Sequence, residues 1–337
     1  MTTQDILYSI KDLSIQYETR LGAVKAVDSV SFDIQKGEVL GLVGESGCGK
    51  STLGKALLRM IEPPGKITSG RLLFDDIDLM TVGPKKIRQY RGGRVGMIFQ
   101  DPMTSLNPVQ SIADHLIEAM LAHGMYNSKE EARSHAESLI DRMGIRPERI
   151  DDYPHQLSGG MRQRVMISLA LALNADLIIA DEATTSLDVI VEAQFLDLLR
   201  ELREEFDLTI ILITHNIGVV AELADRVAVM YAGRIAELGT VYDVFSKALH
   251  PYSQGLMKSV PNIRLEEGST LFKMAGEPPN LLQPPTGCRF HPRCPQAMEI
   301  CSRKVPSFKT STGDHLVACW LYEEHSKEIE EQPGAIS

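Results

Sequence analysis

A glycine-rich loop between an apolar run and a helical segment constrains this chain more than any other feature. In VLGLVGESGCGKST (39–52) the loop fits the pattern G-x-x-x-x-G-K-[ST], and the helical LGKALLRMI follows. In a strand, loop and helix of this kind, backbone N–H groups and the helix N-terminus converge on phosphate oxygens. The predicted phosphate-binding residues are Gly44, Glu45, Ser46, Gly47, Cys48, Gly49, Lys50, Ser51 and Thr52. Of these, Lys50 would reach the outer phosphates and Ser51 would offer its hydroxyl to Mg²⁺.

A pair of carboxylates ends a second apolar run. In ADLIIADE (175–182) four apolar residues lead directly into Asp181 and Glu182. Ligands of α/β sheets bind at the carboxyl ends of strands, so two carboxylates at such an end are expected to face a bound molecule. Asp181 is the predicted holder of the Mg²⁺ shell, and Glu182 would orient or deprotonate an attacking water. The alternative interpretation is a solvated strand end.

The order of patterns along the chain predicts an α/β fold. Short apolar alternation over 7–32 indicates an antiparallel β-layer, and 111–173 is expected to be helical. Apolar strands at 177–180 and 209–213 alternate with a helix at about 189–205, which predicts a parallel sheet covered by helices. After about residue 246 the chain becomes rich in proline, which predicts a loop-rich second module.

Composition limits the class of protein. A chain of 337 residues with 43% hydrophobic residues has room for about two domains. Its net charge of −10 argues against a nucleic-acid surface, which is usually basic. The first residues, MTTQDILYSIKD, lack the pattern of a secretory signal. The apolar stretch 165–173 is shorter than the about 20 residues of a membrane span, so we expect a cytosolic chain.

Four further motifs show a resemblance to a known family. They are LSGGMRQR at 157–164, FQDP at 99–102, TTSLD at 184–188 and ITHN at 213–216. Together with the phosphate loop and the carboxylate pair, in this order, they closely resemble the ATP-binding cassette superfamily over about residues 7–245. The resemblance implies a P-loop ATPase fold with a helical subdomain at about 101–173.

The resemblance also implies a dimer in which each ATP lies between the phosphate loop of one subunit and the LSGG segment of the other. Ser158, Gly159, Gly160 and Met161 would then contact the γ-phosphate bound to the partner. Two glycines after a serine at a helix start suit such a contact, because they expose N–H groups to an anion.

The family pattern assigns roles to other residues. His215 would be the switch residue at the γ-phosphate, Gln100 would contact Mg²⁺ and water, and Asp188 would lie at the dimer seam. Tyr17 is the candidate for stacking on adenine, and Tyr8 is the second candidate. The predicted catalytic residues are Glu182, His215, Gln100 and Lys50, and the predicted Mg²⁺ ligands are Ser51, Gln100 and Asp181.

Three positions depart from the common family pattern. Met161 replaces the commoner glutamine, Ala183 stands where proline often follows the carboxylate pair, and Cys48 stands where serine is frequent. None removes a ligand, so a competent hydrolytic half-site is expected. Cys48 is expected to be a small loop residue, and the alternative is a thiol that makes the site sensitive to oxidants.

The segment HPYSQGLMKSVP at 250–261 and the tail after it resemble the C-terminal extension of bacterial dipeptide and oligopeptide permease ATP-binding subunits. The resemblance implies an ATP-hydrolysing subunit, peripheral on the cytoplasmic side of the membrane, that powers peptide import through two separate transmembrane permease subunits. It implies a heterodimer with a paralogous ATPase subunit, and a homodimer is the alternative in isolation. It also implies that an extracytoplasmic peptide-binding protein is an indirect partner. The alternatives are a non-transport motor for DNA repair, ribosome work or iron–sulfur assembly, and an importer of another substrate such as nickel.

Four cysteines mark this extension. Cys288, Cys294, Cys301 and Cys319 have the spacing C-x5-C-x6-C-x17-C, which is wider than the short knuckles of structural zinc sites. Disulfides rarely persist in the cytosol, so metal ligation is favoured. Wide spacing suits a [4Fe–4S] cluster, and the resemblance supports one; Zn²⁺ with His291 or His315 as a substitute ligand is the alternative.

The predicted domains are a nucleotide-binding domain (1–245), the extension (246–325) and a flexible tail (326–337). Metal ligation by the four cysteines would stabilise the extension, which has too few regular elements to become ordered by itself. All catalytic residues precede 216, so the extension is expected to lie outside the catalytic part.

Overall fold

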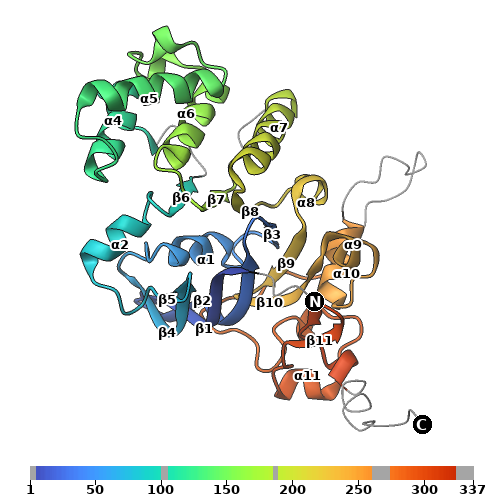
Figure 1. Cartoon of the computed structure of the whole chain (residues 1–337). Coiled ribbons are helices and arrows are strands. Elements are labelled where there is room, and N and C mark those ends of the chain that lie inside the picture. Colours follow the sequence, from blue (N-terminus) through green and yellow to red (C-terminus); the bar gives the residue numbers. More distant parts are fainter. Residues whose placement is uncertain (1–4, 100–104, 185–188, 260–273, 324–337) are drawn as a thin grey trace, which may run out of the picture.

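Two β-sheets organise the protein, whose computed structural model describes residues 5–99, 105–184, 189–259 and 274–323 (Figure 1). Within these ranges, the larger sheet has eight strands in the order β11-β12-β10-β9-β3-β8-β7-β6. Its strands are β3 (Val39–Val43), β6 (Val95–Ile98), β7 (Leu177–Asp181), β8 (Thr209–Ile213), β9 (Arg226–Tyr231), β10 (Arg234–Thr240), β11 (Lys309–Thr312) and β12 (His315–Val317). The run from β9 to β6 is parallel, as the alternation of strands and helices predicts.

The smaller sheet is antiparallel, as the alternation over 7–32 predicts. Its described strands follow the order β2-β1-β4-β5. They are β1 (Ile6–Thr19), β2 (Gly22–Gln35), β4 (Gly65–Phe74) and β5 (Ile77–Asp78). β1 and β2 form a hairpin in which Thr19 lies opposite Gly22.

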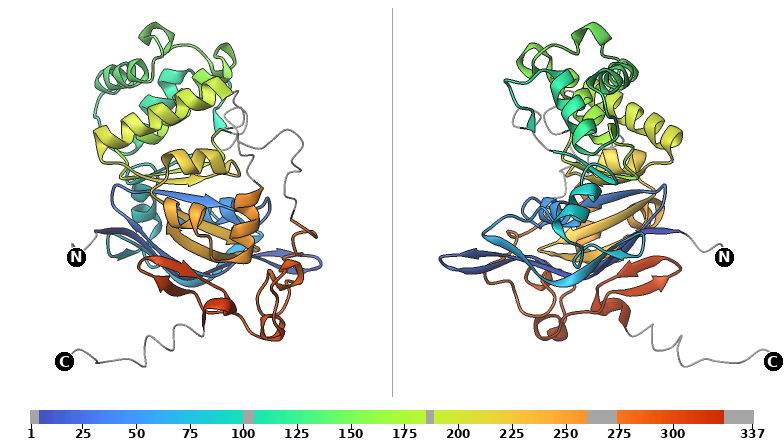
Figure 2. Two further views of the ribbon diagram at one scale, coloured as in Figure 1. Left: turned by 90° about the vertical axis from the view of Figure 1, so that its right-hand side faces the viewer. Right: turned by 60° about the vertical axis from the view of Figure 1, so that its left-hand side comes forward.

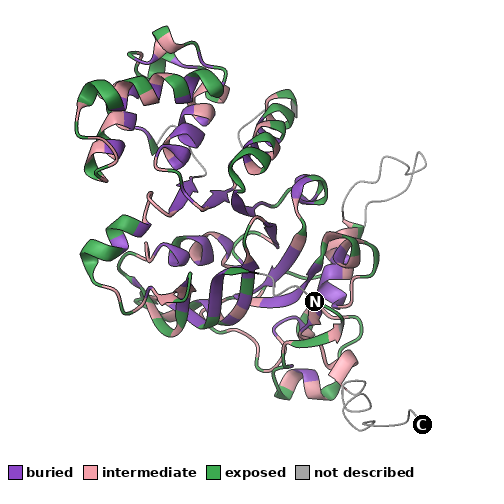
Figure 3. Ribbon diagram, viewed as in Figure 1, coloured by how far each residue is buried: buried purple, intermediate pink, exposed green. Residues whose placement is uncertain are grey.

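The strands of the parallel sheet carry continuous apolar runs because both of their faces are covered. In β7, Ile178 and Ala180 pack into one core with helices, whereas Leu177 and Ile179 pack into a second core on the other face. Successive strand residues point to opposite faces, so one short apolar run serves both cores. Figure 3 shows these strands as the buried centre of the molecule.

Helices cover the sheets and also form a separate layer. The helices that the structure describes are α1 (Lys50–Leu57), α2 (Pro84–Tyr90), α4 (Ile112–Ala122), α5 (Lys129–Arg142), α6 (Gly159–Leu171), α7 (Val189–Phe206), α8 (Ile217–Leu223), α9 (Val241–Ser246), α10 (Pro251–Lys258) and α11 (Glu299–Arg303). Short 3₁₀ turns lie at Pro147–Arg149, Pro154–Gln156, His291–Arg293 and Trp320–Tyr322. α4, α5 and α6 pack together at the top of Figure 1, where the sequence predicts helices. None of the described helices is both long and apolar enough to cross a membrane.

The C-terminal extension adds two strands to the larger sheet, which the sequence did not predict. β12 pairs antiparallel with β10, and β11 pairs with β12 (Figure 2). The buried carboxylate of Glu237 on β10 fixes the join, because its Oε1 lies 2.7 Å from His315 Nε2 and accepts from the N–H of Leu249 at 2.8 Å. Its Oε2 accepts from the N–H of His250 at 2.9 Å. The extension has only short elements, as predicted, and the boundary at 245/246 stays a prediction.

Candidate nucleotide-binding site

The phosphate loop follows β3 and leads into α1, and two of its glycines are required by close contacts. Gly44 has φ 153° and Gly49 has φ 108°, values that side-chain-bearing residues rarely adopt. A Cβ on Gly44 would lie 2.1 Å from the carbonyl oxygen of Met230, and one on Gly49 would lie 2.2 Å from that of Ala26. The loop therefore presses against the backbone behind it and keeps an open side for a phosphate.

Lys50 begins α1 with its side chain folded into this loop. The residue is 4% exposed, and its Nζ donates to the carbonyl oxygens of Gly44 at 2.8 Å and Glu45 at 3.1 Å. An ammonium held at this point lies where phosphate charge would be bound.

The structure brings Ser51 and Asp181 together from positions 130 residues apart. Ser51 Oγ donates to Asp181 Oδ1 at 2.8 Å, which joins the start of α1 to the end of β7. Burial raises the pKa of Asp181, and the neighbouring carboxylate of Glu182 raises it further. A buried carboxylate beside a hydroxyl gives the hard oxygen ligands that Mg²⁺ prefers. The third predicted ligand, Gln100, lies outside the described residues.

Glu182 and His215 face each other across the ends of β7 and β8. His215 Nδ1 lies 3.7 Å from Glu182 Oε1, and the Glu182 side chain is 18% exposed against 56% for His215. Glu182 has φ 48°, and its N–H donates to the carbonyl oxygen of Ile213 at 2.8 Å. Backbone strain of this kind gathers at functional sites, where the surrounding structure enforces it.

The two tyrosine candidates for adenine stacking differ in their burial and in their hydrogen-bond partners. Tyr17 is half-buried, and its hydroxyl lies 3.5 Å from Thr52 Oγ1 beside the phosphate loop. Tyr8 is fully buried and donates its hydroxyl to the carbonyl oxygen of Leu57 at 2.6 Å. Tyr8 is thus a core residue, and Tyr17 stays the candidate.

The LSGG segment starts α6, as predicted. Ser158 caps this helix by accepting a hydrogen bond from the N–H of Met161 at 3.3 Å. Ser158 and Gly159 are exposed, and nothing lies within 4 Å of a Cβ built on Gly159. The segment is therefore open to solvent at the helix N-terminus, and Figure 1 shows α6 in the helical layer, apart from α1. Asp188, the predicted seam residue, lies outside the described residues.

Gln163 was missed as a functional candidate although it lies in the quoted LSGGMRQR motif. It is 1% exposed, and its Nε2 donates to the carbonyl oxygen of Ala183, directly after Glu182. Gln163 thus joins the helix that carries the LSGG segment to the strand end that carries the carboxylate pair. A glutamine on a helix face that is otherwise buried was the only sequence signal for this role.

Cys48 has the environment of a structural residue. It is 5% exposed, and burial raises the pKa of its thiol. Reactive cysteines have a lowered pKa, because the thiolate is the reactive form. The structure therefore favours the small loop residue over the oxidant-sensitive thiol.

The extension contacts the phosphate loop, which the sequence did not indicate; that all catalytic residues precede 216 stays a prediction. Tyr252 on α10 accepts a hydrogen bond at its hydroxyl from the N–H of Glu45 in the phosphate loop, at 2.9 Å. Arg293 donates to both carboxylate oxygens of Glu45, at 2.7 and 2.9 Å. The extension is therefore folded against the phosphate loop at Glu45.

The four cysteines of the extension lie near one another. Burial raises the pKa of Cys288, Cys294 and Cys319, the last to about 12, and neighbouring thiols raise these values further. Cys301 is buried, and its carbonyl oxygen accepts from the N–H of Cys288 at 2.8 Å. Within the described ranges, no three His, Cys, Asp or Glu side chains are grouped so that they could hold a metal ion.

The two alternative histidine ligands have other partners. His315 Nε2 lies 2.7 Å from Glu237 Oε1, and His291 Nδ1 lies 2.9 Å from the carbonyl oxygen of Cys288. His315 is also buried, on the strand that pairs with β10. Each contact uses one ring nitrogen, Nδ1 of His291 and Nε2 of His315, and the Zn²⁺ alternative stays a prediction.

Comparison with known proteins gives two family matches. Residues 27–185 match the ABC transporter family, and residues 236–301 match the family described as the oligopeptide/dipeptide transporter, C-terminal region. The chain is 46% identical to the dipeptide transport ATP-binding protein DppD of Bacillus subtilis, over 95% of this chain and 96% of that protein. It is 45% identical to the oligopeptide transport ATP-binding protein OppD of Escherichia coli, over 94% of this chain and 93% of that protein.

Solved structures give the same fold. The dimeric structure of MJ0796, a bacterial ABC transporter cassette, matches with a TM-score of 0.62 and 27% identity over 69% of this chain and 98% of that one. CbiO1 from Clostridium perfringens, part of the ABC transporter complex CbiONQ, matches with a TM-score of 0.62 and 31% identity over 72% of this chain and 92% of that one.

Proposed function

The chain belongs to the ATP-binding cassette family of transporter ATPases, and on this premise we propose that it powers the import of dipeptides and oligopeptides through a separate membrane permease. ATP is its substrate and Mg²⁺ its cofactor, as in the family. The observation that supports peptides as the transported substrate is the match of the extension to the family described as the oligopeptide/dipeptide transporter, C-terminal region. Relatives named for dipeptide and oligopeptide transport over nearly the whole chain support it.

Each group at the site has a proposed task in hydrolysis. Lys50 binds the outer phosphates of ATP, and the glycine loop, in which a Cβ on Gly44 or Gly49 would collide with the backbone behind it, supplies N–H donors. Ser51 and Asp181 would hold Mg²⁺, which would neutralise phosphate charge when bound. Glu182 takes or orients the proton of the attacking water, and His215, 3.7 Å away, contacts the γ-phosphate.

The exposed LSGG segment suits a partner subunit. Ser158 and Gly159 present a helix N-terminus to solvent, and such an end attracts phosphate. In the proposed assembly this helix N-terminus contacts the ATP that is bound to the phosphate loop of a second subunit. We propose that this second subunit is a paralogous ATPase. The pair lies under two transmembrane subunits on the cytoplasmic side of the membrane, and an extracytoplasmic peptide-binding protein supplies the substrate.

Co-purification and stimulation test this function. We expect the full chain, purified from detergent-solubilised membranes, to bring with it a related ATPase subunit and two polytopic membrane proteins. In proteoliposomes, the peptide-loaded binding protein should stimulate ATP hydrolysis, because substrate binding is coupled to closure of the ATPase dimer. Stimulation by nickel instead would favour the metal importer. Recovery of ribosomes or DNA would favour the non-transport motor and contradict the proposal.

We also propose that Cys288, Cys294, Cys301 and Cys319 hold a [4Fe–4S] cluster. The proposal is supported by four cysteines gathered in a segment with few regular elements, where burial and, to a lesser extent, the neighbouring thiols raise the pKa of Cys288 and Cys319. One Zn²⁺ at about 2.3 Å from each sulfur needs thiolates almost in contact, whereas four irons and four sulfides hold the sulfurs farther apart. The wide spacing of the four cysteines in the sequence suits the larger group, which would stabilise the fold of the extension when bound.

Metal analysis of anaerobically purified protein decides the identity of this group. We expect about four irons and four acid-labile sulfides per chain, with a visible charge-transfer band that is lost on removal of the iron. The variant Cys301→Ser should lose most of the iron, and Cys48→Ser, whose thiol lies in the phosphate loop, should keep it. One zinc and no iron would rule out the cluster.

A further inference from the structure

The phosphate loop is held from outside by the extension. Glu45 directly follows the first glycine of the loop, and its N–H donates to the hydroxyl of Tyr252 at 2.9 Å. Its carboxylate accepts two hydrogen bonds from Arg293, from Nη1 at 2.7 Å and Nη2 at 2.9 Å. Both the backbone and the side chain of one loop residue are therefore fixed by residues more than 200 positions away.

The side chain of Arg293 is buried and held by several partners. Its side chain is 6% exposed, and its Nε donates to the carbonyl oxygen of Ala275 at 3.0 Å. Nη1 also donates to the hydroxyl of Tyr231 at 3.2 Å, and the guanidinium lies 5.7 Å from that ring and 6.0 Å from the ring of Phe290. A planar guanidinium with fixed neighbours loses little freedom on pairing, so this bidentate contact is stronger than a solvated surface pair.

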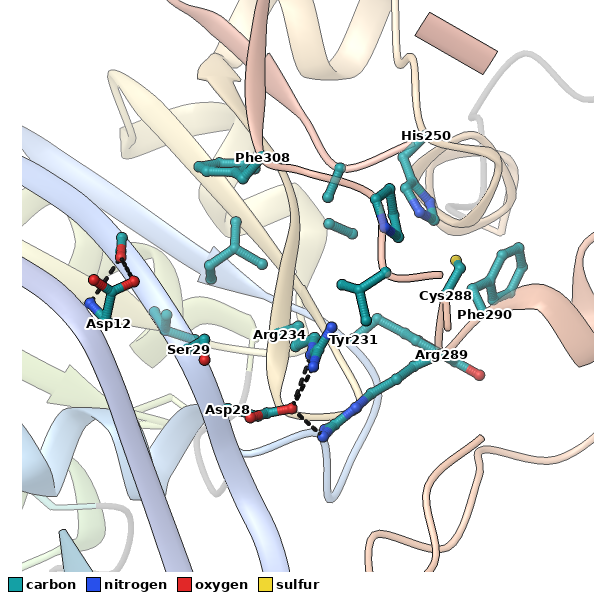
Figure 4. Close-up of a pocket in the computed structure, with 17 residues that line it drawn as sticks. Asp12, Asp28, Ser29, Tyr231, Arg234, His250, Cys288, Arg289, Phe290 and Phe308 are labelled. Atoms are coloured by element: carbon teal, nitrogen blue, oxygen red, sulfur yellow. Dashed lines mark hydrogen bonds and ion pairs between the residues drawn. The ribbon is translucent and has the colours of Figure 1, made fainter. Parts of the chain in front are cut away.

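A second anchor keeps the segment that carries Arg293 on the nucleotide-binding part. Arg289 donates to the carbonyl oxygen of Ala232 and to Asp28 Oδ2, the latter at 2.6 Å. Arg234 donates to the same oxygen at 2.6 Å. Asp28, Arg234 and Arg289 are among the residues that line a cavity of about 450 Å³. Figure 4 shows how their side chains converge. The turn at 232–233 in turn supports the loop, since the N–H of Gly233 donates to the carbonyl oxygen of Cys48 at 2.8 Å.

We propose that Arg293 is a positioning residue for ATP binding, which holds the phosphate loop in its binding conformation through Glu45. The loop contains glycines with φ 153°, 75° and 108°, so its backbone has many accessible conformations when nothing restrains it. A restraint present before binding lowers the entropy lost when the loop closes on phosphate. Arg293 also balances a carboxylate that would otherwise lie beside the triphosphate. The proposal rests on ATP binding at the loop and on neither peptide import nor the metal.

Equilibrium binding of ATP to the full chain tests this role. Arg293→Ala should raise the Kd for ATP by about tenfold, within the usual range for coupled sites. Arg293→Lys should recover part of the loss, because lysine keeps the charge but not the bidentate geometry. The matched control is Arg303→Ala, which breaks an exposed ion pair with Glu299 in the same extension. A Kd for Arg293→Ala equal to that of Arg303→Ala, in protein that melts like wild type, would overturn the proposal.

The double variant separates positioning from charge balance, and Arg293→Lys serves as the test if Arg293→Ala unfolds. Glu45→Gln removes the charge and leaves Arg293 in place with a neutral partner. If Arg293 acts as a tether, Glu45→Gln/Arg293→Ala stays about tenfold weaker than Glu45→Gln alone. Recovery of wild-type affinity in the double variant would show that Arg293 only neutralises Glu45, and the positioning role would be wrong.

Discussion

Replacing Glu182 with glutamine is expected to stop ATP hydrolysis while ATP remains bound. Glutamine keeps the shape of the side chain at the end of β7 but cannot accept the proton of the attacking water. General acid–base groups contribute about 10²- to 10⁴-fold to rate, so phosphate release should fall by that factor. The measurement is steady-state phosphate release beside an ATP binding isotherm. Because the site would close and not reset, an ATP-dependent dimer should also accumulate in size-exclusion chromatography.

A matched carboxylate serves as the control for this experiment. Glu222 on α8 is 56% exposed and pairs with Arg200 at 3.1 Å, away from the phosphate loop. Glu222→Gln should therefore hydrolyse ATP at the wild-type rate. If Glu182→Gln kept more than about a tenth of the rate, its role as the base would be contradicted, and the neighbouring His215 would be the next group to replace.

Replacing Lys50 with alanine is expected to remove ATP binding itself. Lys50 is the buried ammonium of the phosphate loop, 4% exposed, and it holds the carbonyl oxygens of Gly44 and Glu45. Truncating one partner of a buried charge pair costs enough to raise a Kd by about 10²-fold or more. Isothermal titration with ATP and Mg²⁺ measures this loss.

Two further variants make the result specific. Lys129→Ala removes an exposed lysine at the start of α5 and should bind ATP as wild type does. Ser51→Ala should keep binding to ATP without metal and lose the gain in affinity that Mg²⁺ provides, because its hydroxyl bonds Asp181 at 2.8 Å. Unchanged ATP affinity in Lys50→Ala would contradict the assignment of this loop as the phosphate site.

The local parts of the site were predictable from the sequence because each carries a local pattern. The loop at Gly44–Ser51 has fixed glycine spacing, and the pair at Asp181 ends a continuous apolar run. The meeting of Ser51 with Asp181 also follows from sequence, since carboxyl ends of parallel strands share one edge of the sheet. Chemistry that depends on one strand, one loop and one helix start can thus be inferred without a structure.

The contacts of the extension had no such signal. Glu45 and Arg293 are 248 positions apart, and neither periodicity nor turn chemistry links an isolated arginine to an isolated glutamate. The pairing of β12 with β10 could not be predicted from the sequence for another reason. β12 has only three residues, His315–Val317, too short for an alternating pattern, and its place depends on the buried partner Glu237.

The join between β10 and β12 also bears on the order in which the molecule can be completed during synthesis. The phosphate loop leaves the ribosome before its partners, because Tyr252, Arg293 and the strand that covers β10 are made about 200 residues or more later. Domains fold from the N-terminus as the chain emerges, so until β12 is made Glu237 lacks its His315 partner and the β10 edge of the sheet stays open. A nascent chain of this protein should therefore acquire a finished phosphate loop only after Arg293 has emerged from the ribosome.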